Sequence, residues 1–249
     1  MTMRRVEELR LAFLLLTRVP VGQIRGDVPT MAASSWSWPI VGVFVGAISA
    51  LAFLAGQRLG LPDTMSAILA LASSALVTGA MHEDALADLA DGFGGGRDRA
   101  RKLEIMRDSR IGAYGVTALC LALLFRTFGI AAVAGSGAQG LAFLGLAAMT
   151  RAVQPAAMVL MPAARADGLG HAARGASLAP ATVALALGLC ALIPLGPVAG
   201  AGAALAVALG AGGVALLAMR QIGGQTGDVL GAMQMLGECA GWAALILLT

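Results

Sequence analysis

Acidic side chains gather in one short stretch of this sequence, residues 82–112, which holds half of the 14 Asp and Glu residues of the chain. Asp84, Asp88 and Asp91 follow the spacing i, i+4, i+7 and would line one face of a helix, with Glu83 one position to the side. Carboxylates so close repel one another unless a cation neutralises them, and oxygen ligands favour a hard ion. The spacing therefore predicts an Mg2+ site with all of these carboxylates as ligands. A solvated acidic helix end is the simpler alternative.

Glycines and then basic residues follow the carboxylates directly. Gly92 and the run 94–96 come first, and a series of Lys and Arg residues follows between Arg97 and Arg110. Glycine lets backbone N–H groups approach anionic oxygens, and Arg pairs bidentately with phosphate. The glycine pattern matches neither the Walker A loop nor the dinucleotide fingerprint. Beside the acids, the stretch predicts a site for a phosphate-bearing substrate. A positive-inside loop against anionic lipid is the alternative, and both interpretations can hold.

Phosphoryl transfer is the chemistry that such a set of residues supports. Mg2+ bridging a diphosphate, together with Arg or Lys on the leaving group, would supply the main catalytic contributions. A carboxylate could accept the proton of an attacking hydroxyl. Asp84, Asp88 and Asp91 are therefore the candidate catalytic residues.

The rest of the chain is strongly apolar, with 58% hydrophobic residues and a mean hydropathy of +0.83. Such a composition fits roughly seven helical spans of about 20 residues and leaves no room for a separate soluble domain. We expect a single all-α integral membrane domain over residues 1–249, a polytopic helical bundle preceded by an amphipathic, interfacial helix at the N-terminus. The catalytic segment would be 82–110. The expected spans are 36–57, 64–81, 111–133, 139–161, 178–195, 198–219 and 229–248.

Charge distribution indicates the orientation and excludes some classes of function. If the basic N-terminus is cytoplasmic, alternation places 82–110 and the loop 165–174 on the cytoplasmic side, and Arg58 outside. A net charge of +3 with 4% aromatic residues gives no support for nucleic-acid binding. A transporter is the rival class, but the acids cluster outside the spans and no internal repeat is evident. Ionisable residues inside the expected spans should be buried and paired; they are Arg126, Arg151 and Glu238.

Three stretches of the sequence resemble the cobalamin synthase family, the adenosylcobinamide-GDP ribazoletransferases. The first runs from HEDALADLADG at residue 82 to RKLEIMRDSRIGAYG, which ends at residue 115. The others are PAARADGLG at 162–170 and GGQTGDVLGA at 223–232. The resemblance thus covers most of the chain. It departs at Glu83, where the family is associated with HLDGLAD-like strings, so that Glu83 is either a ligand or an added neighbour.

The resemblance implies an Mg2+-dependent reaction at the bacterial inner (cytoplasmic) membrane, with the active site facing the cytoplasm. Adenosylcobinamide-GDP would be joined to α-ribazole or its 5'-phosphate, releasing GMP and forming adenosylcobalamin or its 5'-phosphate. The sequence leaves open which acceptor is preferred and whether the chain forms a homo-oligomer. The residues expected to bind substrate are Lys102, Arg107, Asp108, Ser109, Arg110, Arg165, Thr226 and Asp228.

Two further alternatives remain at this stage. Asp88-x-x-Asp91-Gly92 is also similar to the paired aspartates of CDP-alcohol phosphotransferases, although their longer pattern is not reproduced here. Asp228 could be a ligand on the same face, or simply the N-cap of the last expected span.

Overall fold

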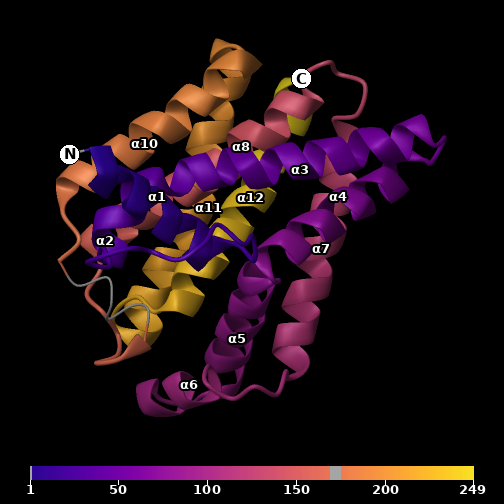
Figure 1. The fold of residues 1–249 in the computed structure, drawn as a ribbon. Coiled ribbons are helices and arrows are strands. Elements are labelled where there is room, and N and C mark those ends of the chain that lie inside the picture. Colours follow the sequence, from indigo (N-terminus) through magenta and orange to yellow (C-terminus); the bar gives the residue numbers. More distant parts are fainter. Residues whose placement is uncertain (1, 169–174) are drawn as a thin grey trace.

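The computed structural model describes residues 2–168 and 175–249 and shows helices joined by short connections (Figure 1). Within these residues there is no strand, and one isolated parallel bridge pairs Ala163 with Gln225. The expected all-α class is therefore confirmed. The helices are α1 (Thr2–Leu16), α2 (Met31–Ser34), η1 (Ser35–Ser37), α3 (Trp38–Arg58), α4 (Asp63–Thr78), α5 (Met81–Gly95), α6 (Arg99–Ile105), α7 (Ala113–Ala132), α8 (Gln139–Leu160), α10 (Leu178–Leu192), η2 (Ile193–Leu195), α11 (Pro197–Ile222) and α12 (Gly227–Leu248).

Six helical segments of the described chain are long and apolar enough to cross a membrane, and a bent pair, α4 with α5, makes a seventh if it counts as one span. This confirms the expectation of a polytopic bundle with about seven spans. The expected span 64–81 corresponds to α4, which does not qualify alone. The large apolar side chains that this pair exposes all lie on α4; they are Met65, Ile68, Leu69 and Leu76. We therefore take α4 as the membrane-embedded part of this seventh span and α5 as its continuation outside the membrane.

The break between α4 and α5 turns the chain by 90°. It is made by two successive left-handed residues, Gly79 at φ 69° and Ala80 at φ 56°. Ala80 is the only residue other than glycine with positive φ in the described chain. This conformation is unfavourable for a residue with a Cβ, so the surrounding packing must hold it. The turn directs α5 away from α4 and into contact with α7 and α12 (Figure 1).

The centre of the bundle is formed by α8 and α12, whose side chains are mostly buried. The helix α3 approaches α8 closely through Gly42 and Gly46. A Cβ at these positions would come within 2.2 Å of the Ala147 carbonyl oxygen and 2.4 Å of the Phe143 carbonyl oxygen. The approach allows dispersion contact along both backbones, which is the main source of helix association in lipid.

The N-terminal helix α1 packs against α2, η1 and α3. Its Glu8 side chain is buried and accepts hydrogen bonds at 2.7 Å from Trp36 Nε1 and from Arg5 Nη1. This charged contact holds α1 against the start of the first span. The expected helix is thus present, while its interfacial placement stays a prediction.

Candidate active site

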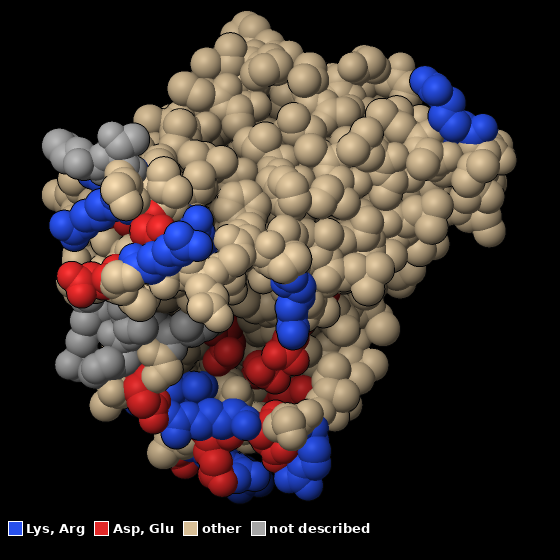
Figure 2. Space-filling view, viewed as in Figure 1, with Lys and Arg blue, Asp and Glu red and all other residues tan. Residues whose placement is uncertain are grey.

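Carboxylates from two helices that are far apart in the sequence lie close together at the polar end of the bundle. Asp84 and Asp88 come from α5 and Asp228 from the first turn of α12. Burial, together with the negative charges of Asp84, Asp228 and Asp91, raises the pKa of Asp88 to about 7, while Arg165 opposes the shift. Figure 2 shows acidic side chains (red) in a hollow with basic ones (blue) above and below it. The repulsion that raises this pKa is what a bound cation would relieve.

The carboxylate Asp91 makes a different contact from its neighbours. Its Oδ2 accepts a hydrogen bond from the Gly112 N–H at 2.6 Å and its Oδ1 one from the Gly115 N–H at 2.8 Å. These amides belong to the start of α7, so Asp91 caps that helix and ties it to α5. A Cβ on Gly115 would lie 2.3 Å from Asp91 Oδ2, which explains a glycine at this position.

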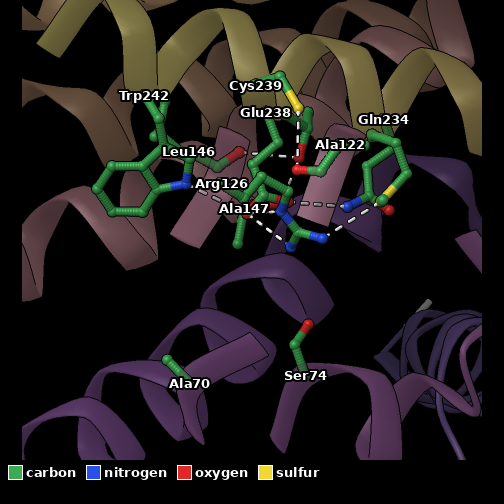
Figure 3. Close-up of polar contacts among 12 residues, drawn as sticks. Ala70, Ser74, Ala122, Arg126, Leu146, Ala147, Gln234, Glu238, Cys239 and Trp242 are labelled. Atoms are coloured by element: carbon green, nitrogen blue, oxygen red, sulfur yellow. Dashed lines mark hydrogen bonds and ion pairs between the residues drawn. The ribbon is translucent and has the colours of Figure 1, made fainter. Parts of the chain in front are cut away.

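The side chain of Glu83 faces the interior of the bundle, on another face of α5. Its Oε1 lies 3.3 Å from Arg126 Nη1, and Arg126 Nη2 lies 2.9 Å from Glu238 Oε1. Figure 3 shows Arg126 directed towards Glu238, which also accepts from Trp242 Nε1 and Gln234 Nε2. The expectation that ionisable groups within the spans are buried and paired is confirmed for Arg126 and Glu238. The structure thus places Glu83 in an ion-pair network and not beside the three aspartates.

Two loops that are far apart in the sequence lie side by side near Asp228. The Ala164 N–H donates to the Gln225 carbonyl at 2.9 Å, and the Gln225 N–H to the Pro162 carbonyl at 2.8 Å. This contact joins the second and third resemblance stretches. Leu169 and Gly170 of the second stretch lie outside the described residues.

Thr226 and Asp228 have different structural roles at the start of α12. Thr226 is the N-cap, since its Oγ1 accepts from the Val229 N–H at 3.2 Å. It also donates to Asp228 Oδ2 at 3.2 Å, and Arg165 Nη2 lies 3.4 Å from the same oxygen. The N-cap alternative for Asp228 is therefore wrong. Its carboxylate is held at the loop contact by Thr226 and Arg165.

The basic helix α6 contacts the loop 162–168 through a hydrogen bond and an ion pair. Arg99 Nη2 donates to the Ala164 carbonyl at 3.0 Å, and Arg107 forms an ion pair with Asp167. Arg107 and Arg165 line a hollow of about 380 Å3 between α6 and this loop. Lys102 lies nearby and donates through Nζ to Gln221 Oε1. The lining also includes Glu104 and Asp167, so phosphate oxygens would bind here by replacing carboxylate partners of the two arginines.

The remaining expected substrate residues, Asp108, Ser109 and Arg110, lie in the turn after α6. Arg110 Nη2 pairs with Asp108 Oδ2 at 2.6 Å, and these hydrogen bonds lower the pKa of Asp108 to about 2. Ser109 is exposed. In the structure the acid and the base of this turn pair with each other, so their role towards substrate stays a prediction.

A cavity of about 240 Å3 adjoins the acidic cluster and is lined by both Asp84 and Asp228. Its other walls are mainly apolar and come from α1, α2, α3, α5 and α12, with Trp38, His82 and Gln154 also contributing. Sequence reasoning missed Trp38 and Gln154 as site residues. The only available signal was a polar glutamine inside an expected span.

The donor set of the acidic cluster suits Mg2+ only together with a substrate. Within the described residues no three carboxylate, histidine or cysteine side chains stand close enough to hold an ion alone. Mg2+ commonly uses one or two carboxylates together with water and substrate phosphate oxygens. Asp84, Asp88 and Asp228 fit that pattern, whereas both oxygens of Asp91 already accept backbone hydrogen bonds.

Comparison with known proteins gives a consistent result along almost the whole chain. The family of cobalamin-5-phosphate synthases matches residues 8–246. A protein of Bradyrhizobium diazoefficiens is 45% identical over 235 residues, covering 94% of this chain and 90% of the relative. One from Mesorhizobium japonicum is 41% identical, with 94% and 91% covered. One from Azorhizobium caulinodans is 45% identical, with 85% and 83% covered. Each relative is named adenosylcobinamide-GDP ribazoletransferase. No solved structure matches the chain.

Proposed function

The chain belongs to the cobalamin-5-phosphate synthase family and is a transferase of cobalamin biosynthesis, and we propose the following reaction for it. Adenosylcobinamide-GDP is the donor, and α-ribazole or its 5'-phosphate is the acceptor. The word phosphate in the family's name favours the phosphorylated acceptor. Family membership replaces both alternatives raised by the sequence, the CDP-alcohol phosphotransferase and the transporter.

The proposed step is an attack on the diphosphate of the donor. A ribazole hydroxyl oxygen forms a bond to the phosphorus on the corrinoid side, the P–O bond to the guanosine phosphate breaks, and GMP leaves. Asp228 lines the cavity beside Asp84 and a smaller one beside Arg165, and we assign it to accept the hydroxyl proton. Arg107 and Arg165 are assigned to the phosphates.

The observation that carries this proposal is the meeting of Asp84 and Asp88 with Asp228 beside Arg165. We propose that Asp84 and Asp88 would hold Mg2+ together with the diphosphate of the bound substrate. Neutralisation of the charge on the diphosphate is the chemistry that the ion would supply there. Asp91 and Glu83 are assigned to holding α7 and Arg126, because their oxygens are already engaged.

The location of the reaction follows from the distribution of charge. The carboxylates, α6 and the loop 162–168 lie at one end of the bundle, whereas Arg58 ends α3, which leads away from it. By the positive-inside rule the basic end is cytoplasmic. We propose that the protein lies in the bacterial cytoplasmic membrane with its site facing the cytoplasm.

The direct test is GMP release by the purified protein in detergent, given adenosylcobinamide-GDP and α-ribazole 5'-phosphate with Mg2+ or with a chelator. We expect GMP and the joined corrinoid in equal amounts, with Mg2+ only. GMP without the joined product would mean hydrolysis, and undiminished transfer in chelator would remove the metal from the proposal. No release from folded protein would refute the activity.

A further inference from the structure

Three buried polar atoms without hydrogen-bond partners belong to residues that line the cavity beside Asp84 and Asp228. They are Trp38 Nε1, His82 Nε2 and Gln154 Oε1, and each lacks a partner among the described residues. The exposed fractions of the three residues are 3%, 2% and 2%. Because buried polar atoms in folded proteins are nearly always paired, a group of them around one cavity indicates a ligand.

The rest of the cavity wall restricts what that ligand can be. Leu15 and Leu16 of α1, Met31 of α2 and Leu230 of α12 supply apolar surface. A ligand that leaves water for this space must be largely apolar and carry only a few polar atoms. Charged phosphate groups are excluded, because Asp84 and Asp228 are the charged residues of the lining.

The size of the cavity narrows the choice further. A volume of about 240 Å3 exceeds the roughly 150 Å3 that holds benzene in an apolar cavity, and is below the about 300–1,000 Å3 of sites for whole drug-sized ligands. It suits a bicyclic aromatic ring that is one part of a larger molecule. The guanine of the donor fits poorly, because it carries more polar edge atoms than the three unpaired atoms of the wall can meet, and the others would face apolar side chains.

We propose that this cavity is the acceptor subsite and binds the aromatic base of the ribazole. The proposal rests on the proposed function and adds to it the location at which the acceptor binds. With the base between α1 and α12, the attached ribose lies at Asp84 and Asp228, where its hydroxyl loses a proton. The donor then occupies the opposite side of the carboxylates, next to Arg107 and Arg165. The N-terminal helix α1 is thereby part of the substrate site.

Two neighbouring leucines of α1 provide a matched pair of variants. Leu15 lines the cavity, whereas Leu14 is 43% exposed and is not part of its lining. Leu15→Trp fills the space, and we expect the KM for α-ribazole 5'-phosphate to rise at least tenfold, with the KM for the donor and kcat within about twofold. Leu14→Trp should behave as the unaltered protein. An unchanged acceptor KM in Leu15→Trp, or an equal rise in the donor KM, would overturn the subsite.

A second measurement uses the unaltered protein and so does not depend on the folding of a variant. The aromatic base of α-ribazole is 5,6-dimethylbenzimidazole. An acceptor with unsubstituted benzimidazole in its place buries less apolar surface, and its KM should be roughly tenfold higher than that of α-ribazole 5'-phosphate. Equal KM values for both acceptors would overturn the proposal. A lipid chain would then be the remaining candidate for the occupant of the cavity. Absence of transfer with either acceptor would instead refute the proposed function.

Discussion

At the scale of single residues, one helix puts neighbouring carboxylates to different uses. On α5, Asp84 and Asp88 face Asp228, Asp91 accepts two backbone N–H groups, and Glu83 pairs with Arg126. Each use has its own energetic basis: for the first pair the relief of repulsion by the proposed cation, for Asp91 the satisfaction of a helix end, and for Glu83 the neutralisation of a buried charge. Substitutions that neutralise a carboxylate in each of these three roles should therefore have different effects.

Asp88→Asn should reduce kcat for transfer at least about 100-fold, because it removes a charge from the pair that we propose to hold Mg2+, without changing the side-chain shape. The measurement is GMP release at saturating substrates over a range of Mg2+ concentrations. Asp27→Asn is the control, since Asp27 is exposed in the loop before α2. Asp88→Asn with full Mg2+-dependent turnover would contradict the site.

Glu83→Gln should lower stability by about 2 kcal/mol and leave the Mg2+ concentration for half-maximal activity unchanged. The loss arises because Arg126 keeps only Glu238 as a full counter-charge in a buried position. Thermal unfolding in detergent and an Mg2+ titration together check this. If Glu83 were a metal ligand, the substitution would raise the required Mg2+ concentration several-fold, which is the contrary outcome.

The raised pKa of Asp88 predicts how stability depends on pH in the presence of a chelator. Because its pKa is about 7 in the folded protein and 3.8 is the ordinary value, the folded state binds more protons between these values. Stability should therefore fall as the pH rises from about 4 to 7 and stay low above that. Thermal unfolding across this range would show the decline, and Asp88→Asn should reduce it. Stability that increases over the same interval would contradict the prediction.

At the scale of helices, contacts between elements decide which residues meet. The apolar runs predicted the helices well, because a span needs about 20 apolar residues whatever its neighbours are. The bend at Ala80 was not predicted, since the left-handed region is unusual for alanine and only packing against α7 and α12 selects it.

The site could be predicted from the sequence only in part, for the same reason. Helical spacing placed Asp84, Asp88 and Asp91 on one face but could not tell a metal ligand from a helix cap. That distinction depends on the Gly112 and Gly115 amides, which approach from α7. The loop contact between Ala163 and Gln225 and the cavity lining are likewise tertiary, and no spacing in the sequence reports them.

Gly115→Ala should destabilise the protein by about 1–2 kcal/mol, the usual cost of losing a helix cap. The added methyl group would lie 2.3 Å from Asp91 Oδ2 and so separate α7 from α5. Gly140→Ala is the matched control, because a Cβ there meets nothing within 4 Å. Unfolding temperatures of the two variants check the prediction, and equal values would show that the approach of α7 to Asp91 is unimportant.

At the scale of the whole molecule, polar chemistry is confined to one end of an apolar bundle (Figure 2). Alternating spans then assign the two ends to opposite sides of the membrane. In a variant whose Cys120, Cys190 and Cys239 are alanine, Arg58→Cys should react with a membrane-impermeant maleimide on intact spheroplasts. Arg101→Cys, on α6, should react only after permeabilisation. The reverse pattern would place the site outside the cytoplasm.

The contact between the loops at Ala163 and Gln225 bears on when the protein becomes active during its synthesis. Asp228 and the loop that contains Gln225 are translated long after the carboxylates of α5. A ribosome-bound chain that has inserted its earlier helices holds Asp84 and Asp88 but lacks the residue opposite them. Under the proposed mechanism an incomplete nascent chain cannot consume the activated donor, and catalysis begins only after α12 has entered the membrane.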